Sequence, residues 1–331
     1  MKRWHFWAGL LISAVFLFFA FRGLQFDTLW KTIQSASFWW LIPAILVYFI
    51  AVWTRTWRWH FLLLPIKAIP SKNIFPILTI GYMGNNIFPA RAGELIRSIL
   101  LKRRYGISIS ASLATILVER IFDGIVVLGF VILNLGSIIS LGEYQLIVFL
   151  GSAIFIGALL ILFLIALFPS KAYQLLINLT NLFIPRRWRE GIAGFLDRFI
   201  EGLSSLRSPK VLLMALVSSV LIWTIESAVY WLVMLAFPFE VSFLNLIFMN
   251  GVVNLATTLP SAPGYIGTFD APGIALLQTL GIKGSTAAGY TLVLHAVLWL
   301  PITILGLVLF TKEGINLGEE LERVKKEPNS K

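Results

Sequence analysis

The sequence predicts an all-α polytopic membrane protein, with about six full transmembrane helices and two re-entrant broken hairpins arranged as an inverted repeat. Three observations predict this fold class: an apolar composition, a series of membrane-length apolar segments, and two places where polar residues interrupt such a segment. Of the 331 residues, 58% are hydrophobic and 13% are charged, and the mean hydropathy is +0.86. A soluble domain carries about 25% charged residues. The composition therefore indicates helices that face lipid.

The charge balance favours contact with a lipid surface over contact with nucleic acid. Lys and Arg number 27 against 16 Asp and Glu, which gives a net charge of +11, and many basic residues lie between apolar segments. The cytoplasmic excess of basic residues in membrane proteins and the attraction of anionic lipid at the cytoplasmic interface explain this placement. The chain contains no cysteine, which excludes disulfide bonds, thiolate catalysis and cysteine-ligated metal.

The six predicted spans are apolar segments long enough to cross a bilayer core, which takes about 20 helical residues. They are residues 4–21, 39–64, 110–139, 144–168, 211–237 and 285–310. A polar loop with Asp27 and Lys31 is expected after the first span. The second span ends with Arg55 and Arg58 among tryptophans, a composition typical of a helix end at the lipid headgroups. Basic residues after this end place it on the cytoplasmic side, and the resulting topology puts both termini there, in a cell (inner) membrane.

A single domain is expected over residues 1–311, with halves at about residues 1–140 and 141–311. Within it, residues 171–207 repeat apolar side chains at helical spacing and place charges elsewhere on the helical wheel. This pattern predicts amphipathic helices that lie on the cytoplasmic interface. Residues 312–331 are rich in charge and are expected to form a cytoplasmic tail.

The first interruption is G-Y-M-G-N-N-I-F-P-A-R-A-G-E-L-I-R at residues 81–97, within the apolar segment 73–101. Both flanks are basic, and K-R-R follows directly at residues 102–104. A complete crossing would place three consecutive cations outside, against the positive-inside tendency, whereas a re-entrant hairpin returns them to the cytoplasm. Each arm of about 14 residues reaches about 21 Å, past the midplane but short of a full crossing. We therefore predict a hairpin that enters from inside, with its tip at residues 89–94.

The second interruption is N-L-A-T-T-L-P-S-A-P-G-Y-I-G-T-F-D at residues 254–270, within the apolar segment 241–280. Its break at residues 260–267 lacks the basic flanks of the first one. It is interpreted as a second hairpin, which enters from outside.

The order of spans and hairpins in the second half is the inverted copy of the first. Residues 106–117 align without a gap with residues 281–292, and on that register Arg120 corresponds to His295. Inverted repeats with broken helices in matching positions are typical of secondary transporters, whose site lies where the two breaks meet. The alternative is an apolar bundle with two proline kinks, but kinks alone do not require charges at that depth.

The first break carries residues suited to an anion. Arg91, Glu94 and Arg97 recur at three-residue spacing and share roughly one helix face. A helix that begins just after Pro89 presents its free amides and positive dipole end beside Arg91. Arginine offers planar donors that match phosphate oxygens. Arg91 and Arg97, with Arg120 as a third candidate, are therefore predicted to hold a headgroup phosphate.

Glu119, Arg120 and Asp123 lie together on the next span, and the two acids are one helical turn apart. One interpretation is that these acids neutralise Arg91, Arg97 or Arg120 and lock the fold. The other is that they hold a cation or relay protons. Without an accompanying cluster of His or Cys, no metal site is expected.

The remaining candidates are single polar residues in apolar surroundings. Glu226 is either a proton carrier or a partner to a hairpin amide, and His295 is either a titrating group or a hydrogen-bonded packing residue. Asp270 follows the second break and is expected to cap its returning helix. Asn85 and Asn86 are either turn residues or headgroup contacts.

Two motifs together resemble a known family. N-N-x-x-P-A-R-A-G-E-x-x-R at residues 85–97 and S-x-x-x-A-x-x-x-x-E-R-x-x-D at residues 110–123 are similar to the membrane region of lysylphosphatidylglycerol synthases, a family of flippase-like proteins. P-x-x-P-G-Y-I-G at residues 260–267, which contains Gly264 and Gly267, is similar to the second motif of this family. The resemblance covers nearly the whole chain and implies a flippase-like membrane domain whose site includes these motif residues.

The family resemblance also bears on activity. In bifunctional members this region is taken to move an aminoacylated anionic lipid between leaflets, while a soluble C-terminal domain makes that lipid from aminoacyl-tRNA. The present sequence continues for about twenty residues beyond its last apolar segment, so we expect a membrane region without the synthase domain. The transferase activity is not expected to carry over.

The predicted function is translocation of an anionic phospholipid or a lipid-linked headgroup between leaflets, without catalytic residues or a cofactor. The absence of a nucleotide-binding loop motif points to an ion gradient, the membrane potential or the lipid gradient as the drive. Two alternatives remain: a lipid-binding scaffold that does not transport, and a membrane-embedded enzyme that uses Glu119 and Asp123 on lipid.

Overall fold

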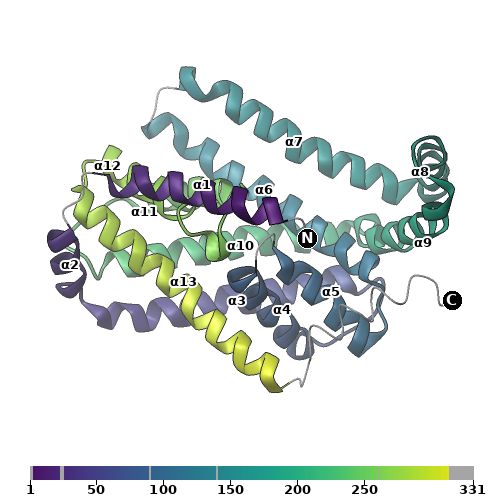
Figure 1. The fold of residues 1–331 in the computed structure, drawn as a ribbon, viewed down its shortest axis with the longest axis horizontal. Coiled ribbons are helices and arrows are strands. Elements are labelled where there is room, and N and C mark those ends of the chain that lie inside the picture. The colour runs from purple at the N-terminus through teal and green to yellow at the C-terminus, as the bar shows by residue number, and fades with distance from the viewer. Residues whose placement is uncertain (1–2, 23–25, 89–90, 139–140, 260, 313–331) are drawn as a thin grey trace.

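The computed structural model in Figure 1 describes residues 3–22, 26–88, 91–138, 141–259 and 261–312. Every regular element in these ranges is a helix. Pro89 and Pro260, which the sequence places in the two breaks, lie outside the described residues, and so does the predicted tail apart from Lys312.

Long helices occupy all six positions at which the sequence predicts a span. They are α1 (Arg3–Phe21), α3 (Leu41–Leu63), α6 (Ile109–Ile138), α7 (Leu141–Leu167), α10 (Pro209–Met234) and α13 (Gly284–Lys312). Among the described residues, three helices are long and apolar enough by themselves to cross a membrane, namely the stretch Phe38–Leu63, α10 and α13. A fourth candidate is the end of α7 together with the next helix, which meet at 109°. The all-α membrane class is confirmed, while the number of crossings stays a prediction.

The outer face of α3 illustrates why these helices suit lipid. Ile42, Leu46 and Ile50 are more than half exposed and lie one turn apart, so they form an apolar stripe on the outside of the bundle. The opposite face, which includes Tyr48 and Arg55, is buried. This helix is therefore apolar toward its surroundings and polar toward the interior, the reverse of a soluble surface helix.

The first predicted hairpin is a pair of antiparallel helices, α4 (Ser71–Ile87) and α5 (Ala92–Tyr105). Their backbones touch at glycines, since a Cβ atom built on Gly93 would lie 1.8 Å from the carbonyl oxygen of Gly81. The break is shorter than predicted, because Glu94 already lies in the first turn of α5. Arg91 adopts a left-handed conformation with φ of 52° and forms the start of that helix.

The second predicted hairpin consists of α11 (Phe243–Ala256) and α12 (Asp270–Thr279), with the short helix η3 (Pro263–Tyr265) between them. Gly264, Tyr265 and Gly267 all have positive φ, so the chain turns irregularly through this break. Helix α1 supports it, because the Ser13 hydroxyl accepts a hydrogen bond of 2.8 Å from the Ala262 backbone N–H. The direction from which either hairpin enters a membrane stays a prediction.

Helices of the first half pack against helices of the second half in a regular pattern. Helix α3 packs against α10, its counterpart in the other half, while α4 packs against α13, and α11 packs against α6. The first arm of each hairpin thus contacts the last long helix of the opposite half. Two inverted copies of one unit would produce this pattern, although the repeat itself stays a prediction.

The remaining helices lie at the two ends of the molecule. They are α2 (Phe26–Gln34), η1 (Phe38–Trp40), α8 (Pro169–Phe183), α9 (Arg186–Gly202) and η2 (Leu203–Arg207). The loop predicted around Asp27 and Lys31 is instead the short amphipathic helix α2, which packs against α13. Helices α8 and α9 occupy the region predicted to be amphipathic, and Figure 1 shows them at the end of the long axis opposite α2.

Candidate functional site

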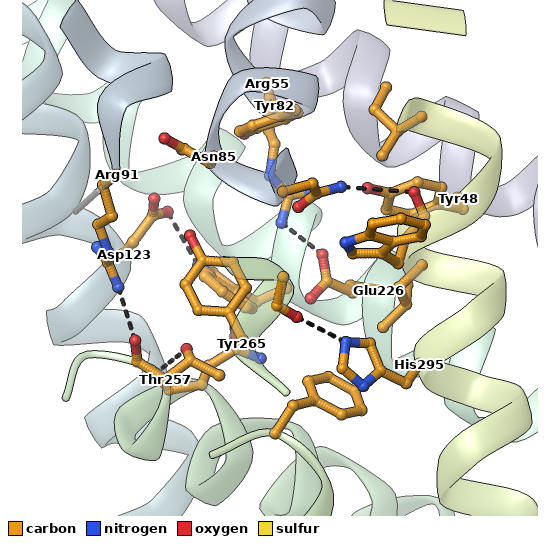
Figure 2. Close-up of a pocket in the computed structure, with 18 of the residues that line it drawn as sticks. Tyr48, Arg55, Tyr82, Asn85, Arg91, Asp123, Glu226, Thr257, Tyr265 and His295 are labelled. Atoms are coloured by element: carbon orange, nitrogen blue, oxygen red, sulfur yellow. Dashed lines mark hydrogen bonds and ion pairs between the residues drawn. The ribbon is translucent and has the colours of Figure 1, made fainter. Parts of the chain in front are cut away.

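A pocket of about 170 Å³ lies where the two breaks face each other. At about 10 to 15 Å³ for each water, it has room for on the order of ten water molecules or a small headgroup. Figure 2 shows Arg91 and Thr257 on one side of the pocket, Glu226 and His295 on the other, and the ring of Tyr265 between them. The sequence-predicted residues that line it are Asn85, Asn86, Arg91, Arg120, Asp123, Glu226, Gly264 and His295.

The other predicted residues lie outside the lining. Two of them pair with residues that line the pocket: Glu94 with Arg120, and Asp270 with His295. Arg97 and Glu119 instead pair with each other, and Gly267 belongs to the second break, where it packs against α1.

The wall formed by α3, α6 and α10 contains two buried ion pairs. Arg55 donates to Glu226 with 2.5 Å between Nη2 and Oε2. Arg58 donates to both oxygens of Asp123, at 2.5 and 3.0 Å, and the indole N–H of Trp223 donates to the same carboxylate at 2.9 Å. Paired and hydrogen-bonded in this way, the four charges can remain buried in a low-dielectric interior.

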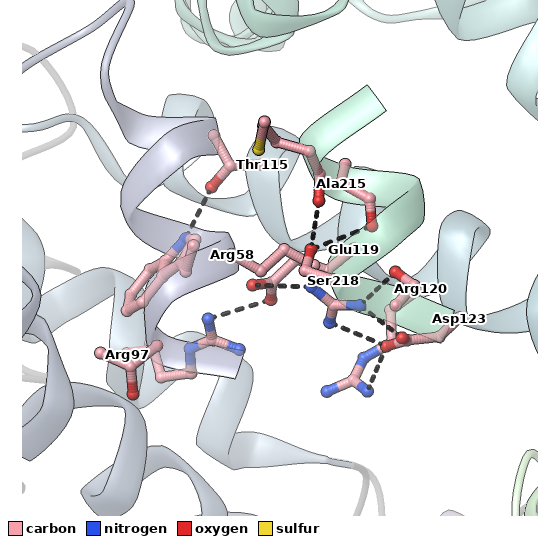
Figure 3. A network of polar contacts seen from close by, with 12 residues as sticks. Arg58, Arg97, Thr115, Glu119, Arg120, Asp123, Ala215 and Ser218 are labelled. Atoms are coloured by element: carbon pink, nitrogen blue, oxygen red, sulfur yellow. Dashed lines mark hydrogen bonds and ion pairs between the residues drawn. The ribbon is translucent and has the colours of Figure 1, made fainter. Parts of the chain in front are cut away.

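Arg97 points into the protein core and away from the pocket. Its guanidinium lies 3.0 Å from a carboxylate oxygen of Glu119 and stacks over the ring of Trp59, with 3.9 Å between Cζ and the ring centroid. The residue is only 1% exposed. Figure 3 shows Glu119 between Arg97 and Arg58. The contacts of Arg97 are those of a residue that joins α3, α5 and α6.

Each break is tied to the long helix that follows it by one polar pair. Arg120 of α6 donates to Glu94 in the first turn of α5, at 2.9 Å between Nε and Oε1. His295 of α13 contacts Asp270 in the first turn of α12, at 2.8 Å from Nδ1 to Oδ1. Arg120 and His295 are the residues that the predicted repeat register places in correspondence.

The hydrogen-bond partners of His295 indicate where the hydrogens of its two ring contacts lie. Nε2 lies 2.8 Å from the carbonyl oxygen of Gly264, which can only accept, so Nε2 carries a hydrogen. The Nδ1 contact with Asp270 then needs a second proton, on the ring or on the carboxyl. The pair is neutral in either case. The other oxygen of Asp270 accepts from the Gly267 backbone N–H at 2.9 Å, so Asp270 holds the break rather than capping its helix.

Arg91 is the lining guanidinium without a carboxylate. Its Nη2 donates to the carbonyl oxygen of Thr257 at 3.1 Å, and its Cζ lies 5.8 Å from the ring centroid of Tyr265. Among the described residues, no Asp or Glu forms an ion pair with it. Since Arg91 belongs to the first break and both partners belong to the second, its side chain bridges the two breaks.

Neutral polar groups complete the pocket. In the described part of the chain, the hydroxyl groups of Tyr48, Tyr82 and Tyr265 form no hydrogen bond, although Tyr48 is only 8% exposed. The side-chain oxygen of Asn85 is also buried without a partner. Asn86, in contrast, donates to the Thr303 hydroxyl at 2.8 Å and so fastens α4 to α13.

Sequence reasoning missed one part of this site. Arg55 and Arg58 were assigned to a helix end at the lipid headgroups and not to the site, whereas they are 7% and 2% exposed and pair with acids of α10 and α6. The depth of this helix end in a membrane stays a prediction. The three-residue spacing of the two arginines was a usable signal, because it places both on one face of an apolar helix. Charged residues in such a helix normally face the interior and pair with acids on other helices. Tyr48 and Tyr82 gave no signal, since aromatic residues in an apolar helix resemble ordinary core residues.

Comparison with known proteins places the chain in a family. A family model described as the lysylphosphatidylglycerol synthase TM region matches residues 6–306. A UPF0104 membrane protein of Methanothermobacter thermautotrophicus is 25% identical over 330 residues, which cover 93% of this chain and 92% of that protein. A UPF0104 membrane protein of Methanocaldococcus jannaschii is 24% identical over 309 residues, or 90% and 92% of the two chains.

A further relative has a named activity. Glycosyltransferase AglD of Haloferax volcanii is 24% identical over 255 residues, which cover 69% of this chain and 41% of that protein. No solved structure matches the chain. The resemblance inferred from the motifs is confirmed, and the membrane-spanning helices together with this family make the chain a multi-pass membrane protein.

Proposed function

Because the chain belongs to the lysylphosphatidylglycerol synthase TM region family, we propose that it moves an anionic phospholipid or a lipid-linked headgroup between the two leaflets of a membrane. The observation that carries the proposal is the unpaired guanidinium of Arg91 in a pocket between two helix breaks. The side chain of Arg91 is half-buried and forms no ion pair with a described acid, so a headgroup phosphate would supply the counter-ion that its guanidinium lacks.

The surrounding ion pairs suit a structural role in this proposal. Arg97 and Glu119 neutralise each other in the core, and Asp123 is held by Arg58. The acids that could serve as acid–base groups therefore have strong partners. We propose that the protein binds and moves its lipid without changing it chemically.

The arrangement of the halves suggests how the lipid would move. Arg91 reaches across the pocket to Thr257 and Tyr265, so a headgroup at Arg91 would sit on the boundary between the breaks. Rocking of one half against the other would expose this boundary first to one leaflet and then to the other. One relative is named a glycosyltransferase, so a sugar-bearing headgroup falls within the proposal.

The test is a leaflet assay with protein in liposomes that contain fluorescent phosphatidylglycerol. A reductant added outside bleaches the label in the outer leaflet, so the rate at which the remaining fluorescence disappears measures translocation. We expect Arg91→Ala to slow this rate at least about tenfold, the equivalent of one charge-assisted hydrogen bond. The matched control is Arg207→Ala, because exposed Arg207 also donates to a backbone carbonyl, that of Ala166 at 2.7 Å, but lies outside the pocket.

Two results would refute parts of the proposal. If Arg91→Ala and wild type translocate the label equally, Arg91 is not the headgroup site. If wild type binds the lipid but does not accelerate its movement, the protein is a lipid-binding scaffold and not a transporter.

A further inference from the structure

The charges around the pocket restrict the headgroup it can take. The acids that line the pocket, or that pair with a residue lining it, each have a partner: Glu226 has Arg55, Asp123 has Arg58, Glu94 has Arg120, and Asp270 has His295. After these pairs are matched, Arg91 remains as a single positive charge. Within the part of the chain that the structure describes, the site thus has one cation without an acidic partner, and all of these acids are paired.

This balance favours a ligand with one negative charge. A phosphodiester neutralises Arg91 and leaves no excess charge in the pocket. An ammonium group in the headgroup would instead find every nearby carboxylate taken by an arginine or histidine. It would have to break one of these pairs or remain buried without a counter-ion, and both are unfavourable.

The unpartnered hydroxyl groups add a second restriction. Tyr48, Tyr82 and Tyr265 line the pocket, and none of their hydroxyls is bonded within the described residues. A phenol hydroxyl can both donate and accept, as the hydroxyl groups of a polyol or a sugar do. These hydroxyls are therefore available to a ligand in the pocket, and they match a ligand rich in hydroxyl groups.

We infer that the pocket selects a phosphodiester headgroup with one net negative charge and neutral hydroxyl groups, and discriminates against headgroups that carry an ammonium group. This inference rests on the proposed function in taking the pocket as the lipid site. It departs from the family description, since a lysyl ester adds two ammonium groups to the glycerol headgroup.

The inference is tested by equilibrium binding to the purified protein in phosphatidylcholine nanodiscs. The probes are phosphatidylglycerol and lysylphosphatidylglycerol with identical acyl chains. We expect phosphatidylglycerol to bind at least about tenfold more tightly, the ratio that loss of one buried charge-assisted contact produces. Equal affinities would overturn the inference.

Two variants separate charge selection from structural damage. Arg91→Glu places a negative charge at the same position, so it should reverse the preference toward the lysyl lipid, whereas a merely structural role for Arg91 would weaken both lipids alike. Tyr48→Phe should weaken phosphatidylglycerol several-fold but leave phosphatidic acid, which lacks the glycerol hydroxyls, unchanged. Tyr105→Phe, outside the pocket, is the control, and equal losses for both lipids in Tyr48→Phe would overturn the hydroxyl part of the inference.

The failure of this inference differs from the failure of the proposed function. If phosphatidylglycerol binds selectively but is not translocated in the leaflet assay, the proposed function fails and the selectivity stands. If both lipids bind equally and both cross, the selectivity fails and the proposed function stands.

Discussion

The ion pair between Arg58 and Asp123 allows a quantitative test of how the interior is held together. Asp123 accepts two hydrogen bonds from Arg58 and one from Trp223, and Arg58 is only 2% exposed. In Asp123→Asn the amide keeps one oxygen but turns its own donors toward the guanidinium. The nearest remaining carboxylate oxygen is that of Glu119, 4.0 Å from Nε of Arg58. A buried guanidinium is then left largely uncompensated.

Breaking one partner out of a buried pair typically costs about 3 to 5 kcal/mol. We therefore expect Asp123→Asn to lower the free energy of unfolding by about 3 kcal/mol, measured by tryptophan fluorescence during titration with a denaturing detergent. Asp197→Asn, at an exposed position of α9, should change it by less than about 0.5 kcal/mol. The double variant Arg58→Met with Asp123→Leu should recover at least half of the loss, because it removes both charges. A loss below about 1 kcal/mol in Asp123→Asn would refute the reasoning.

Three further predictions concern the hairpins. Gly93→Ala should lower the free energy of unfolding by about 3 kcal/mol in the same titration, because the added Cβ would meet the carbonyl oxygen of Gly81. The control Gly129→Ala, which has open space around its Cβ position, should leave the free energy of unfolding nearly unchanged. Arg91→Gly should be about 1 kcal/mol more stable than Arg91→Ala, since only glycine adopts φ of 52° freely. Both variants should lose phosphatidylglycerol binding. Equal stability of the two variants would show that this backbone is unstrained. Arg103→Cys, in this cysteine-free chain, should react with an impermeant thiol reagent from the cytoplasmic side, and reaction only from outside would contradict the inside hairpin.

The breaks were predictable because they depend on local chemistry. Proline and glycine close together in an apolar segment favour a helix end, and the helices do stop at Ile87 and Ala256. A single proline does not suffice, since Pro76 and Pro301 lie inside α4 and α13. The lengths of the breaks could not be predicted from the sequence. Glu94, predicted at the tip of the first hairpin, lies in helix α5, and the second break extends to Phe269 and not only to Gly267. Both boundaries depend on contacts with other helices.

The family, the all-α membrane class and the polar character of the two breaks follow from the sequence alone, because composition, segment length and motif spacing are local properties. The partner of each charge was decided only by tertiary structure. Arg58 meets an acid 65 positions away and Arg55 one 171 positions away, so helix packing alone determines these pairs. That packing directs Arg97 into the core and leaves Arg91, of the guanidiniums lining the pocket, free to meet an anion.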